Sequence, residues 1–316
     1  MSEDQSAEYP VLADYEKLEK LGNGSYGDVY RARDKRTGEL VALKQIRPNE
    51  VCEGISTTTI REASLLQAVN HINLVSVKDV IVDDTFFSIV TEHLDTDLYN
   101  YFSASRKGLS KPLLKSYAFQ LLCGVAYLHS HLIIHRDLKT QNLLINSEGL
   151  LKICDFGLGR SYLLNESRYT PSMASLLYRA PEILLLSEEY TASSDMWSVG
   201  CIIGEMVHGK PIFPGESEID QLNTIFKVIG TPKGHPLYER RVKGEAYCVS
   251  QGVDLAEHIG IEDPQLADLI SKILVFEPND RLTAFEAIKH PFFEDVPNIL
   301  IEKCLPSGAY HVKKHV

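Results

Sequence analysis

Three polar side chains that could transfer a phosphoryl group lie close together in residues 135–142. The carboxylate of Asp137 can orient a hydroxyl group and accept its proton. The ammonium group of Lys139 can neutralise the charge of a phosphate, and the carboxamide of Asn142 can ligate a metal ion. An apolar helical stretch precedes this polar segment, and the apolar residues 143–145 follow it. Because a short loop between two buried elements holds its side chains well, the sequence predicts a catalytic loop here.

A glycine-rich segment, residues 22–29, has the pattern GxGxxGxV. Glycine has no Cβ and adopts positive φ angles freely, so its backbone can lie against phosphate oxygens. A plain glycine-rich hairpin fits the same pattern, and dinucleotide-binding folds use a similar one. The dinucleotide fingerprint needs a helix directly after the glycines, whereas residues 28–32 have the pattern of a strand. The segment therefore indicates a phosphate-binding turn between two strands.

Lys44 lies on a predicted strand, residues 40–46, and points away from the apolar residues of that strand. A single lysine on a strand is usually solvated. The helix predicted next, residues 56–69, carries Glu62, whose carboxylate can pair with Lys44 and aim its ammonium group at phosphates. The two residues together indicate a phosphate-binding lysine.

Asp155 follows an apolar strand and opens a DFG tripeptide shortly after the polar loop. A carboxylate at the end of a strand can hold Mg²⁺, which prefers oxygen ligands, and Asn142 supplies a second oxygen. Downstream, Glu182 has a candidate salt-bridge partner in Arg281. Asp195 begins an apolar helix and is expected to anchor the backbone of the polar loop. These last three residues are predicted to hold the site rather than to react.

The composition of the 316-residue chain is that of a globular protein, with 44% hydrophobic and 24% charged residues. Its formal net charge of -11 disfavours nucleic-acid binding through phosphate contacts. The 6 cysteines include no CxxC pair, so a zinc site and a disulfide framework are not expected. Residues 1–5 are acidic and polar, so we expect no signal peptide. No apolar run approaches the ~20 residues that span a bilayer, so we expect no membrane association. The expected location is cytoplasmic, nuclear or both.

The pattern of the chain changes near residues 92–95, where strand-like segments give way to helical ones. The expected parts are an N-terminal tail (1–14), an N-lobe (15–94), a C-lobe (95–296) and a C-terminal tail (297–316). Apolar spacing predicts a long amphipathic helix at residues 113–132, and residues 194–209 form a second expected helix that is too apolar to lie on a surface. Further C-lobe helices are expected at residues 219–229, 264–274 and 283–289. The charged residues 232–260 are expected to be irregular.

Five motifs occur in the order found in eukaryotic protein kinases, which the chain resembles over residues 15–293. They are the glycine-rich turn, the strand lysine with its glutamate, the polar loop, the DFG tripeptide and the Ala-Pro-Glu tripeptide at residues 180–182. The resemblance implies an α+β, bilobal protein kinase fold, with a small five-stranded sheet and one helix in the N-lobe and a mainly helical C-lobe. It also implies that the protein binds ATP and Mg²⁺ and phosphorylates protein substrates.

The resemblance also implies the catalytic roles. Asp137 would be the catalytic carboxylate, and Lys139 would neutralise the transferring γ-phosphoryl group. Lys44, paired with Glu62, would hold the α- and β-phosphates. The implied metal ligands are Asn142 and Asp155.

An ATP site is implied in the same way. Its residues would be Leu21, Gly22, Asn23, Gly24, Ser25, Tyr26, Gly27, Val29, Ala42, Lys44, Thr91, Glu92, Leu94, Asp97, Gln141, Asn142, Leu144 and Asp155. The adenine would lie between Ala42 and Leu144 and bond to the backbone of Glu92 and Leu94. Thr91 stands where cyclin-dependent kinases usually carry Phe, which should open an extra apolar pocket.

Within the kinases, the chain is most similar to cyclin-dependent kinases. Residues 56–62, from Ser56 to Glu62, resemble the cyclin-contacting PSTAIRE helix, and residues 215–222 are close to the family sequence GDSEIDQL. The resemblance implies a Ser/Thr kinase that is a monomer without cyclin. It would bind a cyclin at residues 56–62 and phosphorylate proteins at Ser/Thr-Pro sites, with a role in cell-cycle or transcription-linked regulation.

Regulation by phosphorylation is implied at two places. A phosphate on Thr170 would bridge three arginines from different elements and order the activation segment. These arginines are Arg61, Arg136 and Arg160. Ser25 and Tyr26 match a pair whose phosphorylation inhibits such kinases, since added charge would repel the ATP phosphates. Two further departures from the family are Leu177, where tryptophan is usual, and Thr140, where proline is usual. The change to Thr140 is expected to leave the catalytic loop slightly less rigid.

Two other interpretations remain open. A mitogen-activated or glycogen-synthase-type kinase would share the motifs, but such kinases lack a helix like residues 56–62. Residues 169–171 here are Tyr-Thr-Pro rather than the Thr-x-Tyr lip. A pseudokinase that acts as a binding scaffold is the second alternative, although Lys44, Asp137 and Asp155 are all present.

Overall fold

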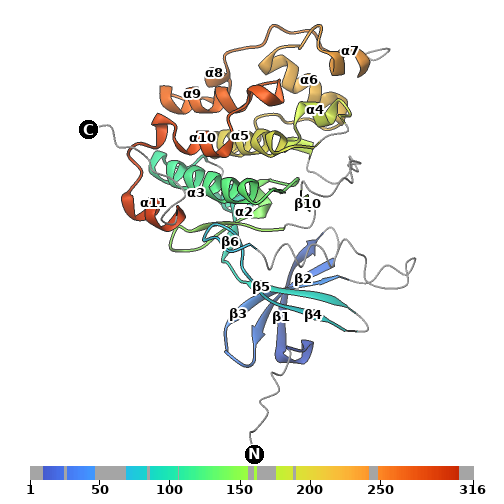
Figure 1. Cartoon of the computed structure of the whole chain (residues 1–316), viewed down its shortest axis with the longest axis vertical. Coiled ribbons are helices and arrows are strands. Elements are labelled where there is room, and N and C mark those ends of the chain that lie inside the picture. The colour runs from blue at the N-terminus through green and yellow to red at the C-terminus, as the bar shows by residue number, and fades with distance from the viewer. Residues whose placement is uncertain are drawn as a thin grey trace, which may run out of the picture. The chain divides into compact units, whose positions relative to one another are not determined.

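The computed structural model describes residues 10–24, 27–46, 69–83, 86–105, 107–155, 160–161, 176–187, 190–241 and 248–305. The chain forms two compact units, shown in Figure 1. Unit 1 contains the residues up to 70 and residues 74–94, and unit 2 contains residues 71–73 and everything from residue 95 onward.

Unit 1 is a five-stranded antiparallel sheet with the strand order β1-β2-β3-β5-β4. Its strands are β1 (Tyr15–Gly24), β2 (Gly27–Asp34), β3 (Leu40–Ile46), β4 (Val77–Val82) and β5 (Phe87–Glu92). This confirms the small sheet expected for the N-lobe. The helix expected at residues 56–69 falls almost wholly outside the described residues.

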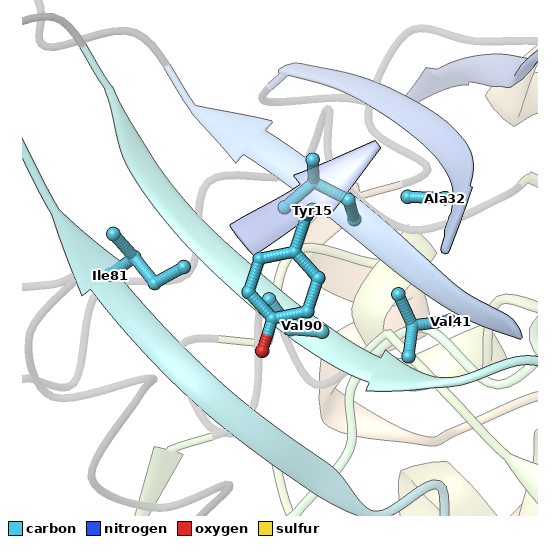
Figure 2. Packing of buried hydrophobic residues seen from close by; sticks show 6 residues of the cluster. Tyr15, Ala32, Val41, Ile81 and Val90 are labelled. Carbon is cyan, nitrogen blue, oxygen red and sulfur yellow. The ribbon is translucent and has the colours of Figure 1, made fainter. Parts of the chain in front are cut away.

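One face of this sheet carries the core of unit 1. The buried side chains in it are Tyr15, Ala32, Val41, Leu43, Ile81 and Val90, most of which Figure 2 labels. Successive residues of a strand point to opposite faces. Ala42 and Lys44 of β3 therefore lie on the face opposite the core, as the alternation of the sequence predicts. Leu12 packs against the core as well, from a short 3-10 helix (Leu12–Asp14) in the stretch expected to be a tail.

Unit 2 is mainly helical. Its helices are α2 (Leu98–Ser105), α3 (Lys111–Ser130), α4 (Pro181–Leu184), α5 (Ala192–His208), α6 (Glu218–Ile229), α7 (Pro236–Arg241), α8 (Leu255–Ile259), α9 (Pro264–Ile273), α10 (Ala284–Ile288) and α11 (Asn298–Cys304). Two small sheets join β6 (Thr96–Asp97), β8 (Leu143–Ile145) and β9 (Leu151–Ile153), and β7 (Ile133–Ile134) with β10 (Arg160–Ser161). The five helices predicted from the sequence are present, each within about two residues of its expected ends.

Helices α3 and α5 form the centre of unit 2, and nearly all their middle residues are buried. On α5, Trp197 stacks on Phe213 with ring centroids 5.6 Å apart. On α3, a Cβ at Gly124 would lie 2.8 Å from Cδ1 of Ile153 and 3.1 Å from the carbonyl oxygen of Asn73. Glycine at this position therefore lets α3 lie directly against β9, which leads to Asp155.

Three expectations about unit 2 need correction. Residues 232–260 are not wholly irregular, because α7 and α8 lie within them. Helix α8 has clear ends, since Asp254 accepts a hydrogen bond from the amide of Glu257 and Gly260 has a φ angle of 76°. Residues 298–304 are helix α11 rather than part of a tail, and the buried Cys304 holds its end in place. Helix α2 was not predicted.

The third correction concerns residues 71–73, which were expected in the N-lobe and belong to unit 2. Asn73 accepts a hydrogen bond from the amide of Ile153 (2.8 Å) and donates one to the carbonyl of Leu151 (2.9 Å). His71 bonds to the carbonyl oxygen of Cys304 (2.8 Å). These contacts tie the segment to β9 and α11.

Among the described residues, no helix is long and apolar enough to cross a bilayer.

Candidate active site

The backbone of residues 135–136 is held by a buried carboxylate from α5. Asp195 accepts hydrogen bonds from the amides of His135 (2.8 Å) and Arg136 (2.9 Å) and from Nε2 of His129 (3.0 Å). Burial alone would raise the pKa of Asp195, but the hydrogen bond from His129 and the neighbouring charges hold that pKa below its usual value. The carboxylate is therefore ionised and anchors the loop, as predicted.

Arg136 has a φ angle of 72°, a left-handed conformation that is strained for a residue other than glycine. The hydrogen bond from its amide to Asp195 compensates for part of this strain. The tight turn at Arg136 changes the direction of the chain just before Asp137. Strain of this kind gathers at functional sites, where the surrounding structure enforces it.

His135 connects the loop to the residues before Asp155. Its Nδ1 accepts a hydrogen bond from the amide of Asp137 (3.2 Å), which leaves Nε2 to donate to the carbonyl of Cys154 (2.9 Å). The imidazole is buried. His135 thus fixes the backbone of Asp137 relative to the backbone that carries Asp155.

The three polar side chains predicted in this loop lie together in unit 2. The ammonium nitrogen of Lys139 donates to Oδ2 of Asp137 at 2.6 Å. Nδ2 of Asn142 lies 2.7 Å from the carbonyl oxygen of Asp137 and 3.3 Å from its Oδ2. Asp137 is 4% exposed, so its carboxylate has a fixed position and few water contacts. This arrangement can orient a hydroxyl group beside a cation that stabilises a phosphate.

Asn142 and Asp155 stand at the ends of paired strands. β8 and β9 pair as far as Leu143 and Ile153, and the amide of Cys154 then donates to the carbonyl of Asn142 at 2.9 Å. Asp155 follows with a φ angle of 62°, a second strained position. The hairpin therefore brings the two proposed metal ligands to one place.

This pair fits a magnesium ion. The amide nitrogen of Asn142 is bonded to Asp137, so its carboxamide oxygen is the atom left for a cation. Among the described residues, no group of three His, Cys, Asp or Glu side chains could hold a metal alone. Mg²⁺ typically binds one or two protein oxygen ligands and completes its shell with substrate phosphates and water. Asn142 and Asp155 suit that role.

Unit 1 gathers a second group of predicted residues on the sheet face opposite its core. Lys44 is paired with Val29 on β2, and Ala42 is paired with Thr91 on β5. Directly opposed residues share a face, so these four side chains lie on one surface. Glu62, the predicted partner of Lys44, lies outside the described residues.

The remaining predicted residues of unit 1 are partly described. Leu21 lies at a bulge of β1 and is 50% exposed. Glu92 accepts hydrogen bonds from the amide and hydroxyl of Ser76 (2.7 and 2.9 Å), and Leu94 is half-buried at the end of the unit. The backbones of the glycine-rich residues Gly22, Asn23, Gly24 and Gly27 form the ends of β1 and β2. Ser25 and Tyr26 lie outside the described residues.

In unit 2, Asp97 and Leu144 are paired across β6 and β8. Asp97 also begins α2, because its Oδ1 accepts a hydrogen bond from the amide of Asn100 at 2.8 Å. Gln141 is exposed in the 3-10 turn Thr140–Asn142. The predicted ribose-side and adenine-side residues of unit 2 therefore lie on neighbouring strands.

Two of the three arginines predicted to bind a phosphate on Thr170 lie in or next to paired backbone segments. Arg160 is paired with Ile134 across β10 and β7, two residues before Arg136. Arg136 lies 5.7 Å from the ring of Tyr190. Arg61 and Thr170 lie outside the described residues, so the predicted cluster around Thr170 stays a prediction.

The buried ion pair predicted between Glu182 and Arg281 is confirmed. Two parallel hydrogen bonds join them, Nη1 to Oε1 at 2.8 Å and Nη2 to Oε2 at 2.7 Å. Arg281 places its other donors on the carbonyl oxygens of Val275, Ser193 and Phe276, so all five are used. This pair holds the Ala-Pro-Glu motif and the start of α4 in place.

Sequence reasoning missed one set of contacts. The hydroxyl of Thr140 lies 2.9 Å from that of Tyr178, which donates to Oε2 of Glu205 at 2.6 Å. Thr140 was expected to leave the loop slightly less rigid than proline would, but its side chain is buried and makes a contact that proline could not make. The sequence signal for these contacts was Glu205, a charged residue within the apolar run of α5, but its position did not indicate which residue it bonds.

In unit 2 the side chains of Asp137, Lys139 and Asn142 lie together, and Asp155 follows the strand paired with that of Asn142. In unit 1 Lys44 lies on the sheet face opposite the core. A family model of the protein kinase domain matches residues 15–293. The matched region covers most of the chain and includes both units, and the sheet and helical units are those of the kinase fold. The family implies transfer of a phosphoryl group from ATP to proteins, with a divalent metal ion. The chain belongs to the protein kinase family.

Proposed function

We propose that this kinase is a cyclin-dependent enzyme that phosphorylates serine or threonine followed by proline. The observation that carries the catalytic part is the Asp137–Lys139 pair, 2.6 Å apart and held by Asn142. The sequence of residues 56–62 and 215–222 supports the cyclin-dependent part. A mitogen-activated type of kinase and a pseudokinase scaffold remain the alternatives, and no contact in the described residues favours either.

In this proposal the carboxylate of Asp137 orients the substrate hydroxyl and accepts its proton as the new P–O bond forms. Lys139 neutralises the γ-phosphoryl group as the bond to ADP breaks. Lys44 of unit 1 holds the α- and β-phosphates. Asn142 and Asp155 hold Mg²⁺, which neutralises charge on the phosphate oxygens when it is bound. Because the transition state is loose, positioning contributes much of the acceleration.

A cyclin is proposed to bind residues 56–62, which the sequence predicts to be helical. The contacts would include Ile60 and Ile55 just before the segment. The test measures phosphotransfer from Mg-ATP to a Ser-Pro peptide with a panel of purified cyclins. At least one cyclin should raise turnover strongly, and Ile55→Asp with Ile60→Asp should abolish both binding and activation. Ile299→Asp, a change of an exposed isoleucine on α11, is the matched control. High turnover without any cyclin would contradict cyclin dependence and favour the mitogen-activated alternative.

A further inference from the structure

Three buried side chains form a chain of hydrogen bonds that the proposed mechanism does not use. They come from the 3-10 turn Thr140–Asn142, from the 3-10 turn Leu176–Tyr178 and from α5. Oγ1 of Thr140 lies 2.9 Å from Oη of Tyr178, which lies 2.6 Å from Oε2 of Glu205. Their exposed fractions are 0%, 4% and 2%. The chain therefore connects α5 to the residue that directly follows Lys139.

Glu205 is costly to bury. Desolvation raises the pKa of Glu205 to about 7, although the hydrogen bond from Tyr178 offsets part of this effect. In the described part of the chain, the thiol of Cys201, one turn earlier on α5, also faces the Glu205 carboxyl group. Arg281 lies near Cys201 but is committed to Glu182. Among the described residues, no charged group of α3, α8, α9 or the 3-10 turns Leu176–Tyr178 and Pro278–Asp280, which pack against α5, offsets the cost of burying Glu205.

The protonation of Glu205 decides the direction of the hydrogen bonds. Burial, with the nearby Glu205 carboxylate, raises the pKa of Tyr178 far above its usual value, so its hydroxyl keeps its single proton. When Glu205 is ionised, Tyr178 donates to it, and Oη of Tyr178 is free to accept the proton of Thr140. When Glu205 is protonated, its carboxyl group can donate to Oη of Tyr178, and Thr140 then competes for the same oxygen. The directions of the two hydrogen bonds are no longer fixed.

The turn that carries Tyr178 is itself fixed to the scaffold. The backbone carbonyl of Tyr178 accepts a hydrogen bond from Oγ of Ser198 on α5 at 2.8 Å. The carbonyl of Leu177 accepts one from Nε2 of Gln221 on α6 at 3.3 Å. The backbone of Tyr178 is therefore held in place by α5 and α6. A hydrogen bond from Thr140 to the Tyr178 hydroxyl in turn constrains the catalytic loop.

We propose that Glu205 is a positioning residue for phosphotransfer, which acts through Tyr178 and Thr140 to hold Lys139 and Asp137 in place. A proline at position 140, usual in the resembled kinases, could not make this contact because it has no hydroxyl group. The inference rests on the proposed kinase activity, so one of its tests must not depend on turnover.

The first test measures amide hydrogen exchange in the full-length chain without substrate. Thr140→Val should speed exchange at Asp137 and Asn142 roughly tenfold, because the loop loses its tie to Tyr178. Thr140→Ser should keep the wild-type rate, since it restores the hydroxyl. Tyr117→Phe, a change at another buried tyrosine outside the network, is the matched control.

The second test measures kcat and KM between pH 6 and pH 8.5 with Mg-ATP and a Ser-Pro peptide. Thr140→Val and Tyr178→Phe should lower kcat roughly tenfold and leave the KM for ATP unchanged, as expected for lost positioning. Relative to wild type, Glu205→Gln should remove an increase of kcat whose midpoint lies at a pH of about 7. The exposed Glu294→Gln should leave the profile unchanged.

The two tests separate the claims. Faster exchange in Thr140→Val with no turnover by any form would support positioning and contradict the proposed activity. Unchanged exchange in Thr140→Val would overturn the inference, whether or not the enzyme turns over. An active enzyme whose kcat profile is the same in Glu205→Gln and wild type would overturn it as well.

Discussion

The carboxylate of Asp137 accepts hydrogen bonds from Lys139 and Asn142, so its orientation is set before any substrate binds. Each neighbour has a second task in the proposed mechanism: Lys139 faces the γ-phosphoryl group, and Asn142 offers its oxygen to Mg²⁺. A single substitution at Asp137 therefore removes an acceptor and disturbs two partners. At the scale of residues, the site is a small set of side chains with shared roles.

Thr91 gives a prediction at this scale. It is half-buried and opposite Ala42 on the sheet face that carries Lys44. In Thr91→Phe, the larger ring should occupy space beside Ala42, so adenine analogues with a bulky apolar group should bind roughly tenfold or more weakly. ATP affinity should change little, because phenylalanine is the usual residue in the resembled kinases. Calorimetry with both ligands measures this, and equal losses for ATP and the analogue would contradict it.

Among the elements of unit 2, helix α5 supplies the main hydrogen bonds that support the catalytic loop and Tyr178. Asp195 near its start holds the backbone of His135 and Arg136, and Ser198 and Glu205 hold Tyr178. Its capped N-terminus and its Gly209 end give it a fixed length. One buried helix thus positions both the catalytic loop and the segment after residue 175.

The Glu182–Arg281 pair allows an element-scale prediction about stability. Arg281→Leu would leave the Glu182 carboxylate buried without its partner, which should cost about 3–5 kcal/mol of unfolding free energy. Arg281→Lys should also be costly, because an ammonium group cannot replace five planar donors. The exposed pair of Lys272 and Asp268 is the control, since Lys272→Leu should cost far less than either change at Arg281. Denaturant titrations measure both, and similar costs would contradict the role of burial.

The activation segment gives a second prediction at this scale. Thr170→Ala should retain ATP binding and lose most phosphotransfer activity, because no phosphate would bridge the arginines that include Arg136. The neighbouring Ser172→Ala is the matched control and should keep full activity. Turnover and ATP affinity of the cyclin-activated enzyme are the measurements. Unchanged activity of Thr170→Ala would rule out regulation at this position.

The elements best predicted from the sequence were long and strongly periodic. Strand β3 was expected at its observed ends, and α3, α5, α6 and α9 were expected nearly so, because their apolar spacing spans several turns. Helices α7 and α8 have only 6 and 5 residues and lie in a charged stretch, whereas the equally short α10 was predicted. The remaining sequence signal for α8 was its N-cap residue, Asp254.

Residue roles were predicted where motifs carry them, and partners were predicted only where opposite charges are obvious. The roles of Asp195 and Glu182 were found in this way. The tie from Thr140 to Tyr178 was not, because a hydroxyl–hydroxyl contact between residues 38 apart depends on the exact placement of two turns. A family departure was therefore read as a loss of rigidity when it adds a contact.

Acidic groups give the whole molecule opposing responses to pH. Asp195 has a pKa below its usual value, since hydrogen bonds from His129 and the loop outweigh burial. Its contribution to stability is present above the unfolded-state pKa and is lost as the pH falls through the folded-state pKa. Glu205 has a raised pKa and acts in the opposite direction.

The Glu205 effect predicts a pH dependence of unfolding. Glu205 ionises near pH 4.5 in the unfolded chain and at about 7 in the folded one. Between these values the folded state binds the proton more tightly, so raising the pH lowers the free energy of unfolding, by about 3 kcal/mol in total. Glu205→Gln should remove this decline, and Glu294→Gln should not. Denaturation at pH 5, 6 and 7.5 measures the slopes, and equal slopes in wild type and Glu205→Gln would contradict the prediction.

The most direct test of the account is phosphotransfer by wild type and Asp137→Asn, measured with Mg-ATP and a Ser-Pro peptide in the presence of an activating cyclin. The wild-type enzyme should transfer phosphate to serine or threonine, and Asp137→Asn should be slower by roughly a factor of 10²–10⁴ with unchanged ATP affinity. Equal turnover by the two forms, or no turnover by a folded wild-type chain that binds ATP with every cyclin, would contradict it.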